Sequence, residues 1–222
     1  MNPKKNQKLS VPTALIVLGT ALAGLLHAGT AAANGPISTD PSMFIKALAQ
    51  DAITVLDSRQ TTVETREKRF QSLLTENFAM EKISRFVVGK HWNRMSSPQR
   101  QQYGRLFEEW LVKYYSIRLN GYSDQRVRVI SKIAVGRNDV LVRTHFEGPT
   151  TPKPIKVNWR VRQFKSGPRI VDVIVEGVSM ITMQRADFTA IIDKRGTEGF
   201  LQKLRARLSE LELTHIKGRP GS

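Results

Sequence analysis

Two carboxylates and a hydroxyl stand near the end of a β-branched run, and residues of these types could perform acid–base or nucleophilic chemistry. Asp172 and Glu176 fall on the same side of the predicted strand 170–176, and Ser179 follows it. At strand rise the two carboxylates are about 13 Å apart, which exceeds the separation in glycosidases that use paired carboxylates. We therefore expect them to pair with arginine or lysine on a neighbouring strand, or to accept backbone N–H groups where the next helix begins.

The residues between and after these carboxylates are predicted to shape the chain. Gly177 would allow the bend from strand to helix, and Ser179 could cap the helix that follows. The order Gly177-Val178-Ser179 does not form the nucleophile elbow of hydrolases, because Ile181 stands where the second glycine is required.

The histidine and cysteine content of the rest of the sequence gives little support for metal or thiol chemistry. After residue 33 the histidines are His91, His145 and His215, which lack metal-ligand spacing, and the chain has no cysteine. Disulfides and thiolate catalysis are excluded, and a structural zinc site is disfavoured. A Ser–His–Asp arrangement of distant residues stays open. We predict a protein that is not an enzyme, with no catalytic residue, metal or cofactor; a hydrolase and a ligand-free envelope scaffold are the less favoured alternatives.

The N-terminus predicts export. Residues 1–33 read as a signal peptide, with three early lysines, the mostly apolar run Val11–Leu26 and the small residues Ala31–Ala33 before cleavage at Asn34. An uncleaved anchor is the alternative, but the run is shorter than the roughly 20 residues that a spanning helix needs. No twin arginine precedes the run, so Sec export to the periplasm is expected.

The chain is strongly basic. Loss of residues 1–33, which hold three lysines and no acidic residue, lowers the formal charge from +16 to +13. Such a charge favours anionic partners. In an exported protein, transient contact with anionic membranes or acidic proteins fits better than nucleic acid; a role in solubility alone is the alternative.

The pattern of apolar residues predicts one α+β domain over residues 34–215, with a flexible tail at 216–222. Helical spacing dominates before residue 121 and after residue 180, and a period of two dominates between them. Such alternation is typical of an antiparallel sheet with one solvated face. We expect a curved antiparallel sheet of about four strands, covered by several helices that enclose an apolar pocket. The expected strands are 126–133, 140–146, 155–162 and 170–176.

Capping residues mark where the helices begin and end. Asp40 and Thr62 are predicted N-caps, Gly89 a helix stop, and Gly196 a break in the terminal helix. A helix over 97–120 carries aromatic residues along one face. We expect this face to oppose Val157, Trp159 and Val161, with either a solid core or a cavity between them.

Several segments in this order resemble the toluene-tolerance (MlaC-type) family of periplasmic phospholipid carriers. They are Val88-Gly89-Lys90-His91-Trp92, Ser96-Ser97-Pro98-Gln99-Arg100, Phe107, Tyr114, Ile170-Val171-Asp172-Val173, Glu176-Gly177-Val178-Ser179, Phe188 and Gly196. The segments Asn120–Ser123 and Asp139–Arg143 also resemble a related hopanoid-associated branch. The resemblance covers residues 41–211 and favours the phospholipid branch through Glu176–Met180.

This resemblance implies an α+β fold with a deep apolar pocket for a phospholipid ligand. It also implies a carrier that moves lipid between an outer-membrane lipoprotein and porin complex and an inner-membrane ABC transporter whose partner subunit has an MCE domain. Such a role would serve outer-membrane lipid asymmetry and solvent tolerance; a hopanoid carrier is the alternative.

Apolar residues on the predicted strands and helices are the candidates for the pocket wall, although for each residue taken alone an ordinary core position is the favoured alternative. They are Trp110, Tyr114, Val157, Trp159, Val161, Val173, Val175, Met180 and Ile181. Arg143, Arg160 and Arg162 could lie near a lipid head group, or simply on a solvated sheet face.

Overall fold

The computed structural model describes residues 40–57, 62–118, 125–149 and 153–217. The predicted signal peptide, its cleavage site and the segment Asn120–Ser123 lie outside these ranges. The helices are α1 (Pro41–Asp57), α2 (Val63–Asn77), α3 (Met80–Val88), η1 (Gly89–Arg94, a 3-10 helix), α4 (Ser97–Arg118) and α5 (Met180–Lys217). The strands are β1 (Arg126–Ala134), β2 (Asp139–Glu147), β3 (Ile155–Phe164), β4 (Gly167–Val175) and β5 (Val178–Ser179).

The helix boundaries confirm the capping predictions. The carboxylate of Asp40 accepts the Ser42 N–H at 2.7 Å, and the Thr62 hydroxyl accepts the Thr65 N–H at 3.2 Å. Helix α3 ends at Gly89, whose φ of 54° is available to glycine at little cost. Gly196 has a φ of 67° and kinks α5.

The strands form one antiparallel sheet in the order β1-β2-β3-β4-β5. The fifth strand was not predicted, because it has only two residues and Gly177 was interpreted as a bend that leads directly into a helix. Instead, the two-residue turn Glu176-Gly177 joins β4 to β5. Both residues have positive φ, 48° and 85°, as a tight hairpin turn of type I′ requires. Gly177 therefore serves a hairpin turn, and α5 begins only after β5.

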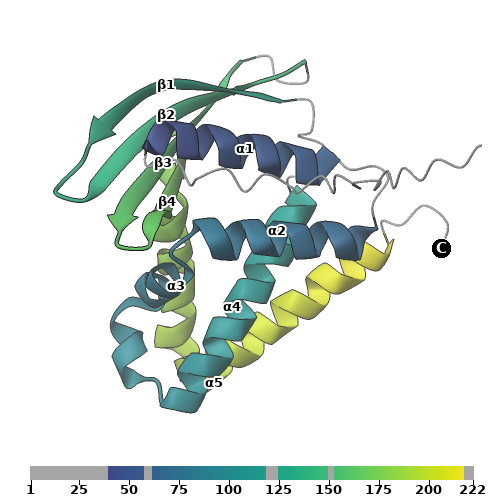
Figure 1. Cartoon of the computed structure of the whole chain (residues 1–222). Helices are drawn as coiled ribbons and strands as arrows, with labels where there is room; N and C mark the ends of the chain where they lie inside the picture. Colours follow the sequence, from purple (N-terminus) through teal and green to yellow (C-terminus); the bar gives the residue numbers. More distant parts are fainter. Residues whose placement is uncertain (1–39, 58–61, 119–124, 150–152, 218–222) are drawn as a thin grey trace, which may run out of the picture. The chain divides into compact units, whose positions relative to one another are not determined.

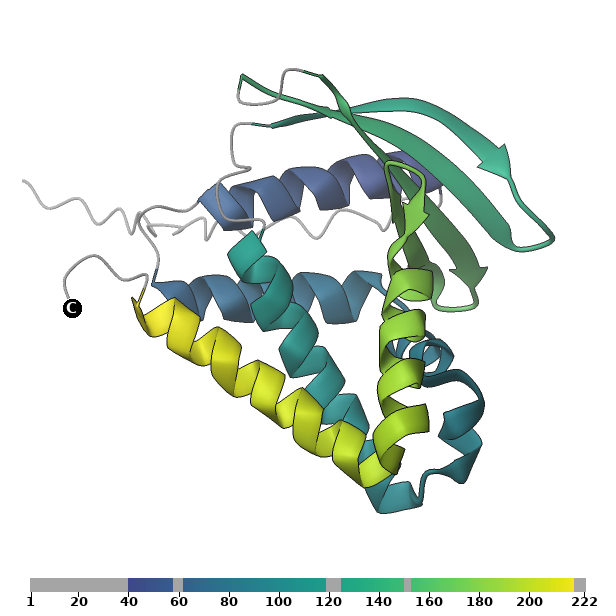
Figure 2. The same cartoon turned by 180° about the vertical axis from the view of Figure 1, so that it is seen from behind.

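One face of the sheet, called the inner face here, packs against α1. Phe44, Ile45 and Leu48 of α1 cover Val142, Val161 and Ile170 of the sheet. Helix α1 runs along this face, and α2, α4 and α5 lie farther out on the same side (Figures 1 and 2). The predicted α+β class, with helices covering an antiparallel sheet, is confirmed.

The register of β1 corrects one predicted face. A bulge between Val129 and Ser131 reverses the alternation, so Lys132 pairs with the inner-face Val142. Ile133 consequently turns outward and is 40% exposed. Sequence alternation had placed Ile133 with Val127 and Val129.

The helices form cores of their own. The aromatic face of α4 packs against α5, where Trp110 contacts Phe188, and not against β3 as predicted. A smaller cluster joins Phe70 and Leu74 of α2 to Val112 of α4. Phe78, just after α2, is partly buried and touches the helical cluster, this smaller cluster and the sheet–α1 cluster.

Candidate functional site

Asp172 is used to begin helix α5. Its side chain is 7% exposed, accepts the Ser179 hydroxyl at 2.7 Å and lies 3.4 Å from the Ile181 N–H. Burial raises the pKa of Asp172, and these hydrogen bonds oppose the rise. The Ser179 oxygen accepts the Thr182 N–H at 3.2 Å and so caps α5, as predicted.

Glu176 forms hydrogen bonds with the backbone of β3 at the end of the β3–β4 strand pair. Its carboxylate accepts the Lys156 N–H at 2.6 Å, and its own N–H donates to the Lys156 carbonyl at 2.9 Å. Both predicted carboxylates thus accept backbone N–H groups. Among the described residues, the hydrogen bonds of the Ser179 side chain join it to Asp172 and Thr182, and none joins it to a histidine.

Five of the nine predicted wall residues share the inner face. Cross-strand pairs join Val157 to Val175 and Trp159 to Val173, and Val161 follows on β3. The Trp159 indole N–H donates to the Thr144 hydroxyl at 3.0 Å, which satisfies its polar atom. The strand spacing therefore correctly placed these five residues on one face of the sheet.

The other four lie apart from this surface. Trp110 is buried between Phe188 and Tyr114, with ring centroids 5.6 Å and 4.9 Å away, in the core that α4 forms with α5. Ile181 packs against the same core, and Met180 is half-buried at the start of α5. The expected single wall of helix and sheet residues is thus two separate groups.

The inner face is covered unevenly. Val142, Val161 and Ile170 are sealed beneath α1. At the opposite end, Val127, Phe146 and Ile155 form a row across β1, β2 and β3, and all three are only half-buried.

This row was missing from the predicted site. Val127 and Ile155 both belonged to alternating segments, so the signal was present, but the row emerges only once the strands are paired. Val173, Val175 and Trp159 continue it as half-buried residues of the same face. The described residues of this row and its continuation are apolar, so burial beside them favours an apolar group over a charged one.

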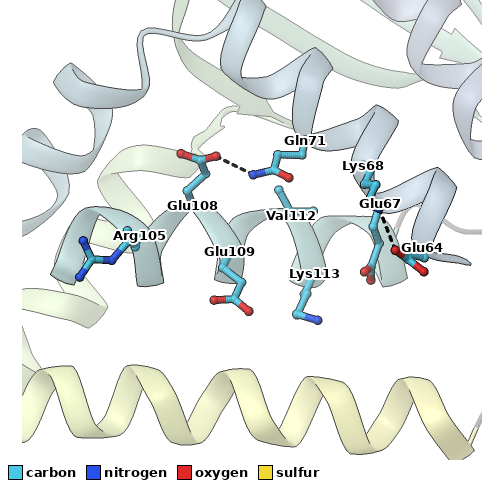
Figure 3. A pocket seen from close by; sticks show the side chains of 9 residues that line it. All are labelled: Glu64, Glu67, Lys68, Gln71, Arg105, Glu108, Glu109, Val112 and Lys113. Atoms are coloured by element: carbon cyan, nitrogen blue, oxygen red, sulfur yellow. Dashed lines mark hydrogen bonds and ion pairs between the residues drawn. The ribbon is translucent and has the colours of Figure 1, made fainter. Parts of the chain in front are cut away.

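A cleft between α2 and α4 has different chemistry. Its volume is about 430 Å³, and Val112 is its single apolar residue (Figure 3). Gln71 of α2 donates to Glu108 of α4 at 2.9 Å across the cleft, and Lys68 donates to Glu64 at 2.8 Å along α2. Glu67, Arg105, Glu109 and Lys113 complete the lining. Since eight of its nine lining residues carry a charged or amide group, the cleft suits an acyl chain less well than the apolar row of the sheet does.

Two further properties concern the described segments alone. They contain no group of histidine and carboxylate side chains that could hold a metal ion. Even the long helix α5 is too polar to cross a membrane, and no other described helix meets that requirement.

The architecture is that of an α+β binding fold, in which a single antiparallel sheet offers an apolar inner face to a set of helices. The sequence model of the MlaC protein family matches residues 46–206, and the chain belongs to this family. It is 21% identical over 207 residues to the intermembrane phospholipid transport system binding protein MlaC of Haemophilus influenzae, and the match covers 90% of each chain.

A solved structure shows the same fold. It is a phospholipid-binding protein of Ralstonia solanacearum in complex with a phospholipid, with a TM-score of 0.70 and 21% identity. The match covers 78% of this chain and 99% of that one.

Proposed function

We propose that this protein is a periplasmic carrier that binds the acyl chains of a phospholipid on the inner face of its sheet. The observation that supports this most directly is the half-buried apolar row Val127, Phe146 and Ile155, which continues through Trp159 and Val175. The names of the related proteins supply the ligand class. On this proposal the role is binding and transport, without catalysis.

The free energy of moving a phospholipid out of a bilayer requires an apolar surface on the carrier. A two-chain lipid has about 30 methylenes, and at about 0.8 kcal/mol each its transfer from a bilayer to water costs on the order of 20 kcal/mol. A carrier must offer nearly the same apolar burial. We assign the lipid contact to four of the predicted sheet residues, Val157, Trp159, Val173 and Val175, whereas the fifth, Val161, lies beneath α1 and would belong to the core. Trp110, Tyr114, Met180 and Ile181 would form the helical support behind the ligand.

The wider role follows from the family and the sequence. Residues 1–33 would direct export and be removed, which leaves 34–215 as the lipid-binding domain and 216–222 as a tail. The carrier would exchange lipid with an inner-membrane ABC transporter that has an MCE-domain subunit and with an outer-membrane lipoprotein and porin complex. Apart from the lipid it would need no cofactor.

Solvent extraction of the purified protein, followed by mass spectrometry, tests the proposal. We expect phospholipid at a substantial fraction of the protein concentration, and transfer of labelled phospholipid from vesicles to the emptied protein. Hopanoid in place of phospholipid would assign the other branch of carriers. A protein that carries no lipid and accepts none from vesicles would contradict any carrier role.

A further inference from the structure

The outer face of the sheet, opposite α1, carries cations from four strands. Cross-strand pairing aligns them in successive rows. We call this surface the basic face; its cations are Arg126, Arg128, Arg143, Lys156, Arg160, Arg162 and Arg169. Both views show the helices on the other side of β1–β3 (Figures 1 and 2). No described helix therefore covers the middle of this surface.

Carboxylates neutralise only part of the basic face. Asp139 is 5% exposed and is held by Arg160 at 2.7 Å and by Arg162 at 2.6 Å. Glu147 pairs with Arg128 at 2.7 Å. Asp172 is buried against the start of α5. Among the described residues, no carboxylate forms an ion pair with the remaining four cations, which are Arg126, Arg143, Lys156 and Arg169.

Arg143 is the best placed of these four. It is exposed in the middle of β2, and its neighbours across the sheet are the neutral residues Ser131 and Asn158. Its guanidinium presents up to five donors in a planar fork, the geometry that suits the oxygens of a phosphodiester. The adjacent hydroxyl and amide can add further hydrogen bonds to the same anion.

Exposed apolar residues border this basic surface. Ile130 is 42% exposed and Ile133 is 40% exposed, both on the edge strand β1. The bulge in β1 is what turns Ile133 outward. Basic residues beside exposed aliphatic side chains are typical of surfaces that rest at the boundary between lipid head groups and acyl chains.

We propose that the basic face docks this protein on the surface of an anionic phospholipid bilayer. The cations spread in two dimensions, about 5 Å apart between strands and about 7 Å apart along them, so they can meet several head-group phosphates at once. The buried core of a protein interface is typically more apolar than its rim and depleted of charge, whereas the centre here is Arg143 with Ser131 and Asn158. The inference rests on the proposed carrier function, since docking would bring the carrier to the membrane that supplies or receives its lipid.

The test is cosedimentation of the full chain with vesicles of phosphatidylcholine, with or without 40% phosphatidylglycerol. We expect binding to the anionic vesicles at 50 mM NaCl and its loss at 500 mM, because salt screens these charges. Arg143→Gln and Lys156→Gln should each weaken the partition ratio about five-fold, and the double variant about 25-fold, since each cation near an anionic surface contributes about 1 kcal/mol.

The matched control changes the same charge elsewhere. Lys194 and Arg205 are exposed on α5, and the double variant Lys194→Gln, Arg205→Gln should keep more than half of the partition. If this control lost as much vesicle partition as the Arg143→Gln, Lys156→Gln double variant, net charge alone would explain the loss. That result would overturn the assignment of docking to the basic face. Absence of binding by the parent protein would also overturn it and would favour an acidic protein partner. Extracted phospholipid should be unchanged in every variant, which separates this test from that of carrier function.

Discussion

Asp172 shows how a residue of catalytic type can serve the fold. Its carboxylate is buried and binds the Ser179 hydroxyl, which in turn caps α5. The sequence offered two roles for the carboxylates, pairing with a basic side chain or accepting backbone N–H groups, and the structure shows the second. Geometry alone could add that one carboxylate serves a helix terminus and the other, Glu176, closes a strand pair.

The titration of Asp172 should appear in the pH dependence of stability. Burial raises its folded-state pKa above the unfolded value near 3.8, so its protonated form stabilises the fold below that value. This stabilisation is lost as pH rises through the folded-state pKa. We expect the free energy of unfolding of the parent, relative to Asp172→Asn, to fall with rising pH across this window and then level off. Urea unfolding at successive pH values measures the difference.

Asp139 provides a control of opposite sign. Hydrogen bonds from Arg162 and Arg160 lower its pKa, so its stabilisation is present above the unfolded pKa and is lost as pH falls through the folded-state pKa. The parent relative to Asp139→Asn should therefore gain stability with rising pH. If the difference in free energy of unfolding changed with pH in the same direction for both variants, the burial assigned to Asp172 and the arginine contacts assigned to Asp139 would be contradicted.

Lipid contact can be tested at single residues of one strand. Val127→Glu places a carboxylate in the half-buried inner-face row, and Ile133→Glu places one on the outer face of the same strand. We expect Val127→Glu to lower the uptake of a monomeric short-chain labelled phospholipid at least ten-fold, because the charge would be desolvated beside the acyl chains. Ile133→Glu should keep normal uptake. Urea unfolding checks that both variants fold; equal uptake would remove Val127 from the binding surface.

At the scale of elements, the sequence predicted where helices and strands lie better than what they contact. Caps at Asp40, Thr62 and Ser179 are local interactions, so they could be read along the chain. The aromatic stripe of α4 was evident too, but periodicity identifies an apolar face without identifying the element that covers it. The partner of Trp110 is Phe188 on α5, far along the sequence.

The kink in α5 depends on one glycine. Gly196 has φ 67° and ψ 178°, a region nearly restricted to glycine, and a Cβ there would meet no neighbouring atom. Gly196→Ala should therefore lower the free energy of unfolding by about 1–3 kcal/mol through backbone strain alone. Gly104→Ala, in regular helix α4 with open space for a Cβ, should raise it by about 0.5–1 kcal/mol. Chemical denaturation distinguishes them, and a neutral Gly196→Ala would argue against the kink.

At the scale of the molecule, three apolar clusters meet at Phe78 in place of one continuous core. The sequence predicted the α+β class, since that class follows from the order of segments with helical and two-residue periods. It could not predict this division, which depends on the bulge in β1 and on the pairing of α4 with α5. The division leaves Val127, Phe146 and Ile155, at one end of the inner face, only half-buried.

A ligand on that surface should stabilise the whole fold. On the proposed function, phospholipid would bind the folded chain and not the unfolded one, so at a free concentration 100 times its Kd it should add about 2.7 kcal/mol to the free energy of unfolding. For a chain of this size that corresponds to a rise in Tm of about 5–10 °C. Calorimetry of the delipidated and reloaded protein measures the difference. Val127→Glu should show a much smaller rise, whereas Ile133→Glu should match the parent. Equal Tm values for the empty and loaded parent would mean that the lipid does not bind the folded domain, and the half-buried row would then need a different occupant.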